Sequence, residues 1–525
     1  MKRVILFVLS ALMILGLAAC GGTGEEDPNK VLNVPENYTL VSTEEATGVT
    51  VHGISVEFDP HFFSQNVTRG NVREEDWQIV VDRVKKMEIH RFRVMLLPSW
   101  LEPLNDNDDP AQLNWEALTT ESAELQSVYK VLELAQSEGI DVNITLWGAE
   151  KKVNLVDLEM NERVNSQGVH FLSQGNQGEN WIIGTLKPEE FAENFSAYVQ
   201  QLVINKGFTC IKEITPINEP CWSYQVNGSS LGDFEAYAAL CRAIDARFRE
   251  DGIRDLVKFN LSDNTDGRVQ WLQDTVSELD GIADLYNSHT YIFGYNTDNE
   301  TIENWEIENL NRTRSTGKVH VIGEFGSNQT TGSTRQSDID TYERGVLIVR
   351  QMLNFFNAGA AGASYWVLFD EYYNYNAAYN EMMQLGLWTS ARADYADDQE
   401  YYRKLTEDYQ IRPQYYAFSL MTKHVKRGAE IYPILLNDNF AVGTAFRNPD
   451  GKWVYAFANG NPEGSALKIA LQNGSVYGSF ARYDYAEDRL PEGDALIESS
   501  SQLTVSGQVL AFELAPNTVT LLCEI

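Results

Sequence analysis

Short apolar runs alternate with amphipathic helical patterns over most of this chain, from residue 49 to residue 426. Eight of these runs have the length and composition of buried strands. Strands that alternate with helices indicate a parallel sheet, and a count of eight predicts that the sheet closes into a (β/α)8 barrel of the α/β class. The expected strands span residues 49–58, 89–97, 140–147, 211–217, 256–261, 282–291, 319–323 and 362–368.

The helices are predicted from apolar residues that recur every three or four positions. Gly139, for example, is expected to end a helix over 125–135. A doubly wound open sheet has the same alternation of elements, but no Gly-rich phosphate loop follows the first strand, so nucleotide binding is not supported. The other helices are expected over 74–87, from residue 188, and over 234–248, 304–311, 342–356 and 413–426.

The pattern changes at about Gly428, where short strand-like runs follow one another with Gly, Asn and Pro between them. No helical pattern separates these runs, which predicts an antiparallel β-sandwich domain over 428–525. Residues 38–41 are a candidate for one more strand of this domain. The expected strands span 442–446, 453–457, 466–471, 477–483 and 509–514.

The N-terminal residues have the layout of a targeting segment. A short basic stretch precedes an apolar run over 4–17, which is shorter than a confident membrane span and typical of a signal peptide. The tetrapeptide L-A-A-C that ends at Cys20 resembles a bacterial lipobox, and this implies lipid attachment to Cys20. A plain signal peptide cleaved nearby is the alternative.

The resulting domain prediction has four parts. These are a signal peptide over 1–19, a tether over 20–45, a catalytic barrel domain over 46–427 and the β-sandwich over 428–525. A lipid anchor would hold the protein in the bacterial cell envelope, outside the cytoplasm, and the membrane would be a partner through this anchor only.

The net charge of −34 argues against nucleic acid as a partner, because phosphates require clustered Lys and Arg. It argues more weakly against anionic substrates. Beyond Cys20 only four cysteines remain, and neither they nor the histidines have the spacing of a zinc site. We therefore expect no metal and no cofactor, and the oligomeric state stays open.

Two glutamates stand at the ends of predicted strands. Asn218-Glu219-Pro220 ends the fourth strand, and Glu324 follows the seventh. In a (β/α)8 barrel the active site lies at the carboxyl ends of the strands, so the two carboxylates are expected to face one another. Paired carboxylates suit glycoside hydrolysis, in which one acts as acid/base and the other as nucleophile.

Other polar and aromatic residues also fall near strand ends. Arg91 and Arg93 lie on the second strand, and either could be the one that faces the barrel interior. Asp263, Asp370 and Glu371 either bind sugar hydroxyls or only solvate loops. The remaining candidates are His289 and Tyr291 on the sixth strand and the aromatic side chains of Trp147, Trp222 and Trp366.

This set of strand ends resembles clan A of the retaining glycoside hydrolases, with a likeness to family 5 cellulases and mannanases; the exact family stays open. The resemblance covers roughly residues 49–426. It implies that Glu219 is the acid/base and Glu324 the nucleophile. It also implies supporting or substrate-binding roles for the remaining matched residues, Arg93, Asn218, His289, Tyr291 and Trp366.

The physical requirements of a retaining mechanism fit these roles. Glu324 must be ionised, so Arg93 and the Tyr291 hydroxyl would stabilise it by charge and hydrogen bonding. Asn218 would bind the sugar 2-hydroxyl. Trp366, with Trp147 and Trp222 as further candidates, offers a flat apolar face for a sugar ring.

The predicted function is double-displacement hydrolysis of β-linked neutral poly- or oligosaccharides. The long irregular segment over 148–187 suggests an extended cleft, and hence an endo-β-glycanase such as a glucanase or mannanase. An exo-acting β-glycosidase of the same clan is the closest alternative. A non-catalytic carbohydrate-binding surface lipoprotein is the alternative from another class.

Overall fold

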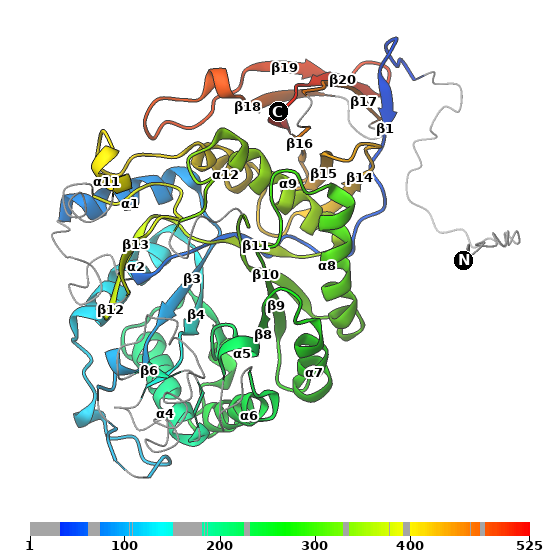
Figure 1. The fold of residues 1–525 in the computed structure, drawn as a ribbon. Helices are drawn as coiled ribbons and strands as arrows, with labels where there is room; N and C mark the ends of the chain where they lie inside the picture. The colour runs from blue at the N-terminus through cyan, green and yellow to red at the C-terminus, as the bar shows by residue number, and fades with distance from the viewer. Residues whose placement is uncertain are drawn as a thin grey trace, which may run out of the picture.

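The computed structural model shows a closed barrel surrounded by helices, with a β-domain against one side (Figure 1). The predicted signal peptide, Cys20 and most of the segment over 148–187 lie outside the described residues. The described residues are 32–60, 74–103, 105–107, 109–150, 181–182, 184–185, 187–224, 232–328, 335–376, 379–391, 400–461, 464–472 and 478–525.

Eight parallel strands form the barrel, and the sheet closes where β11 pairs with β2. This confirms the predicted fold class and the predicted strand count. Every barrel strand falls within or overlaps a predicted apolar run. The strands are β2 (Gly53–Glu57), β3 (Arg91–Leu96), β4 (Asp141–Leu146), β7 (Ile211–Thr215), β8 (Lys258–Asn264), β9 (Leu285–Thr290), β10 (Val319–Phe325) and β11 (Gly362–Tyr365).

Helices follow the barrel strands and cover the outside of the barrel (Figure 1). One of them, α7, was not predicted, although Leu272, Thr275 and Leu279 recur at helical spacing and are buried. The covering helices are α1 (Glu74–Met87), α2 (Ala123–Glu138), α4 (Pro188–Val199), α6 (Phe234–Glu250), α7 (Val269–Leu279), α8 (Asn299–Thr313), α9 (Tyr342–Ala358) and α12 (Pro413–His424).

The ends of α2 show how local sequence sets an element. The Ser122 side chain accepts a hydrogen bond from the backbone N–H of Leu125 and satisfies a donor of the first turn. Gly139 ends the helix in the left-handed conformation, with φ of 69°, which suits a residue without Cβ. The chain then enters β4 directly, as expected from the sequence.

A cluster of buried polar side chains surrounds Glu213 inside the barrel. Arg91 and His52 bind the two carboxylate oxygens of Glu213, and Asn260 donates a further hydrogen bond across 3.1 Å. Burial raises the pKa of Glu213, but the charge of Arg91 and the His52 contact outweigh it and hold that pKa below its usual value. Arg91 therefore faces the interior in a lower layer than Arg93.

The β-domain consists of two sheets. One sheet has the order β14-β15-β16-β21-β18-β19, and the other has the order β1-β17-β20. β14, β19 and β21 were not predicted. The strands are β1 (Thr39–Val41), β14 (Glu430–Ile434), β15 (Ala441–Arg447), β16 (Trp453–Asn459), β17 (Leu467–Gln472), β18 (Ser479–Tyr485), β19 (Ser501–Thr504), β20 (Val509–Leu514) and β21 (Thr518–Glu524).

The chain before the barrel contributes to this domain. β1 pairs in parallel with β17, with Leu40 opposite Ala470, while the other pairings in both sheets are antiparallel. The buried side chain of Val41 packs in the core between the sheets. The candidate strand at 38–41 therefore exists, and the part of the 20–45 segment that forms β1 is folded rather than a tether.

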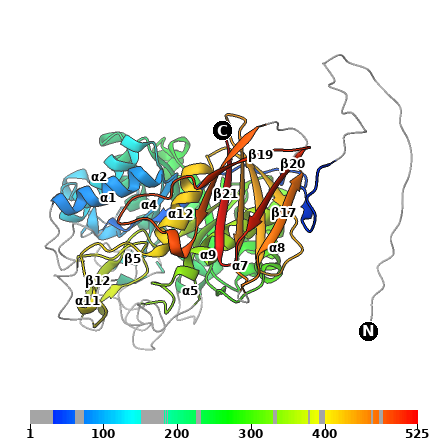
Figure 2. The same cartoon turned by 90° about the horizontal axis from the view of Figure 1, so that it is seen from above.

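The β-domain packs on the barrel helices α9 and α12 (Figures 1 and 2). The rings of Tyr342 and Tyr485 stack with 4.4 Å between their centroids, and each hydroxyl donates to the other residue's backbone carbonyl. Gly345 leaves room for the Tyr485 ring, because a Cβ there would lie 2.4 Å from the Tyr485 hydroxyl oxygen. The two domains share one apolar core.

In the described part of the chain, no helix is both long enough and apolar enough to cross a bilayer.

Candidate active site

Glu219 and Glu324 meet at the carboxyl ends of the barrel strands. One carboxylate oxygen of each lies within 4.8 Å of the other. The Glu219 side chain is 29% exposed, whereas that of Glu324 is 7% exposed. A separation of about 5 Å between two carboxyl groups is the geometry of a retaining mechanism, because one can attack while the other protonates the departing oxygen.

The backbone holds Glu219 in an uncommon conformation. Its φ of 45° and ψ of 52° lie in the left-handed region, which a residue with a Cβ adopts only when its surroundings impose it. The N–H of Asn218 continues the sheet by donating to the Leu146 carbonyl, and the N–H of Glu219 donates to Asp263 Oδ2 across 3.0 Å. Pro220 then opens the short helix α5 (Pro220–Ser223).

Arg93 connects the nucleophile candidate to its neighbours. Its guanidinium donates to Glu324 Oε1, to Asn218 Oδ1 at 2.9 Å and to Asp263 Oδ2 at 3.0 Å. The side chain is 2% exposed. Burial lowers the pKa of Arg93, but the nearby carboxylates raise it above its usual value, so the group stays charged. Arg93 is thus the arginine of the second barrel strand that contacts Glu324.

His289 lies between three carboxylates. Its Nδ1 is 2.9 Å from Glu219 Oε1 and 3.5 Å from Glu324 Oε2, and its Nε2 is 2.9 Å from Asp263 Oδ1. Burial lowers the pKa of His289, but Asp263 and Glu324 outweigh it and raise that pKa to about 10. The imidazolium form can therefore donate to Asp263 and Glu219 at the same time.

Tyr291 completes the contacts of Glu324. Its hydroxyl donates to Glu324 Oε2 across 3.0 Å. Burial raises the pKa of Glu324, and the positive charges of His289 and Arg93 oppose that rise. Burial also raises the pKa of Tyr291 well above its usual value, so its hydroxyl keeps the proton that it donates.

The tryptophan candidates separate into two groups. Trp147 and Trp366 are half-buried and contact each other edge to face, with 6.1 Å between ring centroids. Trp222 is 45% exposed and lies under the Arg268 guanidinium at 4.2 Å. The structure thus brings together Trp147, which follows β4, and Trp366, which follows β11, although β2 and β3 lie between these strands. It places Trp222 on α5, just after Glu219.

The three carboxylates that the sequence left undecided have different positions. Asp263 is fully buried at the centre of the site. Asp370 is buried against Arg412, with contacts of 2.6 and 2.8 Å, and Glu371 accepts the backbone N–H of Asp59. Of these three carboxylates, Asp263 is the one whose hydrogen bonds reach Glu219 and the supporting residues Arg93 and His289.

Two further carboxylates near the site were missed by the sequence interpretation. Glu57 is buried with Oε2 at 3.6 Å from Arg93 Nη1, and burial raises its pKa well above the usual value. Asp266 accepts the Tyr291 backbone N–H, and burial raises the pKa of Asp266 to about 6. Glu57 ends the first barrel strand, a position that could have marked it in the sequence.

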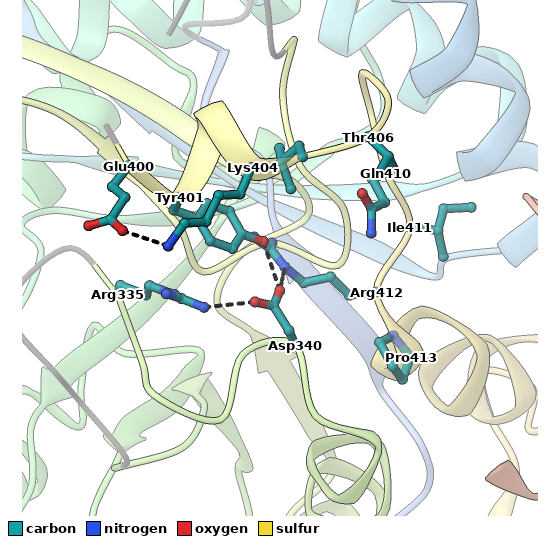
Figure 3. A pocket seen from close by; sticks show the side chains of 11 residues that line it. Arg335, Asp340, Glu400, Tyr401, Lys404, Thr406, Gln410, Ile411, Arg412 and Pro413 are labelled. Atoms are coloured by element: carbon teal, nitrogen blue, oxygen red, sulfur yellow. Dashed lines mark hydrogen bonds and ion pairs between the residues drawn. The ribbon is translucent and has the colours of Figure 1, made fainter. Parts of the chain in front are cut away.

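A cavity of about 580 Å³ lies elsewhere, beside the short helix α11 (Glu400–Lys404) (Figure 3). Its polar wall is an ion-pair cluster in which Asp340 binds Arg335 at 2.7 Å and Arg412 at 2.9 Å. The residues that line it include none of the predicted site residues. The chemistry at the strand ends is therefore separate from this cavity.

Glu219, His289 and Glu324 also have the arrangement of possible metal ligands. Both ring nitrogens of His289 already contact carboxylates, and Arg93 contacts Glu324. A guanidinium and an imidazolium at these positions would repel a cation. The expectation that the reaction needs no metal and no cofactor stays a prediction.

No protein-family model and no curated protein match this sequence. Solved structures do match its fold. The catalytic domain of a family 30 glycoside hydrolase, xylanase C from Talaromyces cellulolyticus, is 13% identical, with a TM-score of 0.62 over 93% of this chain and 100% of that one. A family 30 subfamily 8 xylanase from Clostridium acetobutylicum is 11% identical, with a TM-score of 0.59 over 93% and 100%.

An α-L-arabinofuranosidase from Thermotoga maritima is also similar, at 12% identity and a TM-score of 0.55 over 93% of this chain and 99% of that one. Similarity at such low identity concerns the fold. In each case it extends over both the barrel and most of the β-domain. The chain therefore has the fold of these glycoside hydrolases, a (β/α)8 barrel with an attached β-domain, as its resemblance to clan A implied.

Proposed function

We propose that this protein is a retaining glycoside hydrolase that acts by double displacement. The observation that carries the proposal is the approach of the Glu219 and Glu324 carboxylates to within 4.8 Å at the strand ends of the barrel. That separation leaves space for a sugar carbon between an attacking oxygen and a proton donor, but not for an attacking water as well.

In the first step Glu324 attacks the anomeric carbon while Glu219 gives its proton to the departing glycosidic oxygen. Glu324 is the better nucleophile of the pair because Arg93 and Tyr291 bind its oxygens and stabilise its charge. Glu219 is the proton donor in this proposal, as the resemblance to clan A implies, and it is the more exposed of the two carboxylates, at 29% against 7%. A covalent glycosyl-enzyme results.

In the second step Glu219 acts as the base. It removes a proton from water, which attacks the anomeric carbon and releases Glu324 with net retention of configuration. His289 contacts Glu219 at 2.9 Å and can donate a hydrogen bond to its ionised carboxylate at this stage. In this proposal Asn218, whose side-chain oxygen accepts a hydrogen bond from Arg93, binds the sugar 2-hydroxyl.

The substrate that we propose is a β-linked neutral poly- or oligosaccharide, cleaved in endo fashion as by a glucanase or mannanase. The half-buried indoles of Trp147 and Trp366 supply apolar faces for sugar rings, and the net charge of −34 disfavours anionic chains. An exo-acting β-glycosidase would use the same carboxylates. Product analysis separates the two, since an endo enzyme releases mixed oligosaccharides and an exo enzyme releases one small sugar.

A reducing-sugar screen over β-glucans, mannans, xylans and galactans tests the activity. Glu324→Gln should abolish turnover, to below about one ten-thousandth of the wild-type rate, because no glycosyl-enzyme can form. Glu219→Gln should cost about 10²- to 10⁴-fold with poor leaving groups and less with activated ones. Near wild-type hydrolysis by Glu324→Gln would sink the mechanism, and so would NMR evidence that the first-formed product is inverted.

Binding of oligosaccharides without turnover on every glycan tested would favour the alternative from another class, a carbohydrate-binding surface protein. The wild-type protein and Glu324→Gln would then give the same binding isotherms and no product. Product formation by the wild-type protein but not by Glu324→Gln excludes this alternative.

We also propose that Cys20 carries a lipid that anchors the protein outside the cytoplasm. The support is the short apolar run and the L-A-A-C tetrapeptide. Metabolic labelling with a radioactive fatty acid should label the wild-type protein but not Cys20→Ala. Equal labelling of both, or labelling of neither, would contradict the proposal.

A further inference from the structure

We propose that Asp263 is the positioning residue of this site, which fixes the backbone of Glu219 and holds His289 as an imidazolium that donates to Glu219. Its expected effect on turnover rests on the proposed function, whereas its effect on His289 does not. Asp263 is fully buried, so it acts through the residues that it binds and not on substrate.

A local irregularity of β8 brings Asp263 into the site. In a regular strand successive side chains point to opposite faces, so two neighbours cannot both face the barrel interior. Ser262 and Asp263 have φ values of 87° and 52°, and the pairing of β8 with β9 shifts register between Ser262 and Asn264. This bulge lets Asp263 reach the barrel centre, and backbone of this kind clusters at functional sites.

Asp263 uses both carboxylate oxygens. Oδ2 accepts the backbone N–H of Glu219 and an Arg93 N–H, each across 3.0 Å. Oδ1 lies 2.9 Å from His289 Nε2. One buried carboxylate therefore binds the acid/base backbone, the arginine beside the nucleophile and the histidine beside the acid/base.

The bond to the Glu219 N–H has a structural consequence. Glu219 lies in the left-handed region, where a non-glycine residue is strained. The Glu219 N–H donates a charge-assisted hydrogen bond to Asp263 Oδ2, and the free energy of this bond compensates for the strain of the Glu219 backbone. Without it, the Glu219 carboxyl group would lose its fixed distance from Glu324.

The contact with His289 has an electrostatic consequence. Burial lowers the pKa of His289, but the charges of Asp263 and Glu324 outweigh it and raise that pKa to about 10. With the Asp263 carboxylate in place, His289 therefore holds a proton on both nitrogens. An asparagine at position 263 would carry no charge to stabilise the imidazolium. A neutral His289 carries a single N–H, so its Nδ1 would donate to Glu219 in one tautomer and face it as an acceptor in the other.

Four of the buried charges balance one another: Arg93 and His289 carry two positive charges, and Asp263 and Glu324 carry two negative ones. Two further carboxyl groups face them. Glu57 lies 3.6 Å from Arg93, and burial raises its pKa well above the usual value, while burial raises the pKa of Asp266 to about 6. Glu219 can then hold the proton that it donates without disturbing the balance of the four charges. Loss of the Asp263 charge is expected to remove the proton of His289 in order to keep this balance.

Asp263→Asn tests the proposal because it keeps the size of the side chain. We expect kcat/KM to fall about 10²- to 10³-fold, mostly in kcat, since orientation is lost while the sugar contacts remain. In Asp263→Asn the alkaline limb of the pH profile of kcat/KM should shift to higher pH by about one unit, because the positive charge of His289 beside Glu219 is lost. Asp274→Asn, on the outer side of α7, is the matched control and should change neither quantity.

NMR of ¹⁵N-histidine-labelled protein gives a readout independent of turnover. His289 should be an imidazolium at pH 8 in the wild-type protein and neutral in Asp263→Asn. A neutral His289 in the wild-type protein would overturn the proposal even if the variant does not fold. Unchanged kcat, an unchanged alkaline limb and a retained imidazolium in a folded Asp263→Asn would overturn it as well. An inactive wild-type protein with the expected NMR result would instead contradict the proposed function.

Discussion

The Tyr291 hydroxyl donates to Glu324 Oε2 across 3.0 Å, from the strand end next to the one that carries the glutamate. Tyr291→Phe removes this bond and leaves the ring in place. A hydrogen bond to a charged group contributes about 1.5–3 kcal/mol, so kcat should fall roughly 10- to 100-fold. Tyr295→Phe, whose hydroxyl donates to Asn517 away from the site, is the control. Equal rates for both variants would argue against a role of Tyr291 in stabilising Glu324.

Arg93 and Arg91 form a natural pair for comparison, because both are buried on β3 but bind different glutamates. Arg93→Lys retains a charge but loses the fork that reaches Glu324, Asn218 and Asp263 together, so kcat should fall by about 100-fold or more. Arg91→Lys should lower the free energy of unfolding by about 1–3 kcal/mol through the Glu213 contact, with kcat of the folded protein nearly unchanged. Steady-state kinetics and urea denaturation measure kcat and the free energy of unfolding of both variants. Equal losses of kcat in the two variants would contradict the separate roles of Arg93 and Arg91.

The raised pKa of His289 predicts a pH dependence of stability. The folded-state pKa of about 10 exceeds the unfolded value, which is about 6.5, so the folded state binds the proton more tightly. The stabilisation is complete below pH 6.5 and is lost as the pH rises through 10. We expect the wild-type protein to lose on the order of 4 kcal/mol more than His289→Asn between these pH values. Urea titrations at each pH give the free energy of unfolding of the two proteins. If these free energies changed in parallel with pH, the prediction would be contradicted.

Gly323, next to the nucleophile candidate, leaves space for the residues of β9. A Cβ there would lie 2.6 Å from Asn287 Oδ1 and 3.1 Å from His289 Nε2. Gly323→Ala should therefore cost about 1–3 kcal/mol of stability and disturb the bond between His289 and Asp263. Gly281→Ala has no atom within 4 Å of its new Cβ and should be neutral. Thermal unfolding and kcat are the measurements, and a silent Gly323→Ala would contradict the close approach.

Tyr485 tests whether the β-domain supports the barrel. Tyr485→Ala removes the ring that stacks on Tyr342 and should cost about 3–5 kcal/mol. Tyr485→Phe keeps the stack and loses only the hydroxyl bond, which should cost about 1 kcal/mol. Deletion of 428–525 should lower the melting temperature of the barrel rather than change its sugar preference. Unchanged melting after deletion would show that the domains are independent.

Much of the fold followed from local patterns. The apolar runs identified all eight barrel strands, because a strand buried on both faces by helices must be nearly continuous in apolar residues. The edge strands β14 and β19 of the larger sheet were not predicted, and β19 has only four residues, most of them exposed. β21 was missed as well, although it lies in the middle of that sheet and its first five residues are buried.

The residues of the site were predictable where a strand end marked them. Glu219, Glu324, His289 and Tyr291 follow apolar runs, and the structure brings them together. Asp263 follows a predicted strand too, but the sequence left open whether it binds sugar hydroxyls or only solvates a loop. Only the bulge at Ser262, which no local pattern in the sequence reveals, turns it inward.

The sequence by itself determined the order of strands and helices, the class of the fold and the presence of a glutamate at the ends of the fourth and seventh barrel strands, because each of these depends on spacing along the chain. The tertiary structure decided the separation of Glu219 and Glu324, the contact of Glu324 with Arg93 rather than Arg91, and the contact of Asp263 with His289. These depend on barrel closure and on strand register, which place side chains from five different strands within hydrogen-bonding distance of one another.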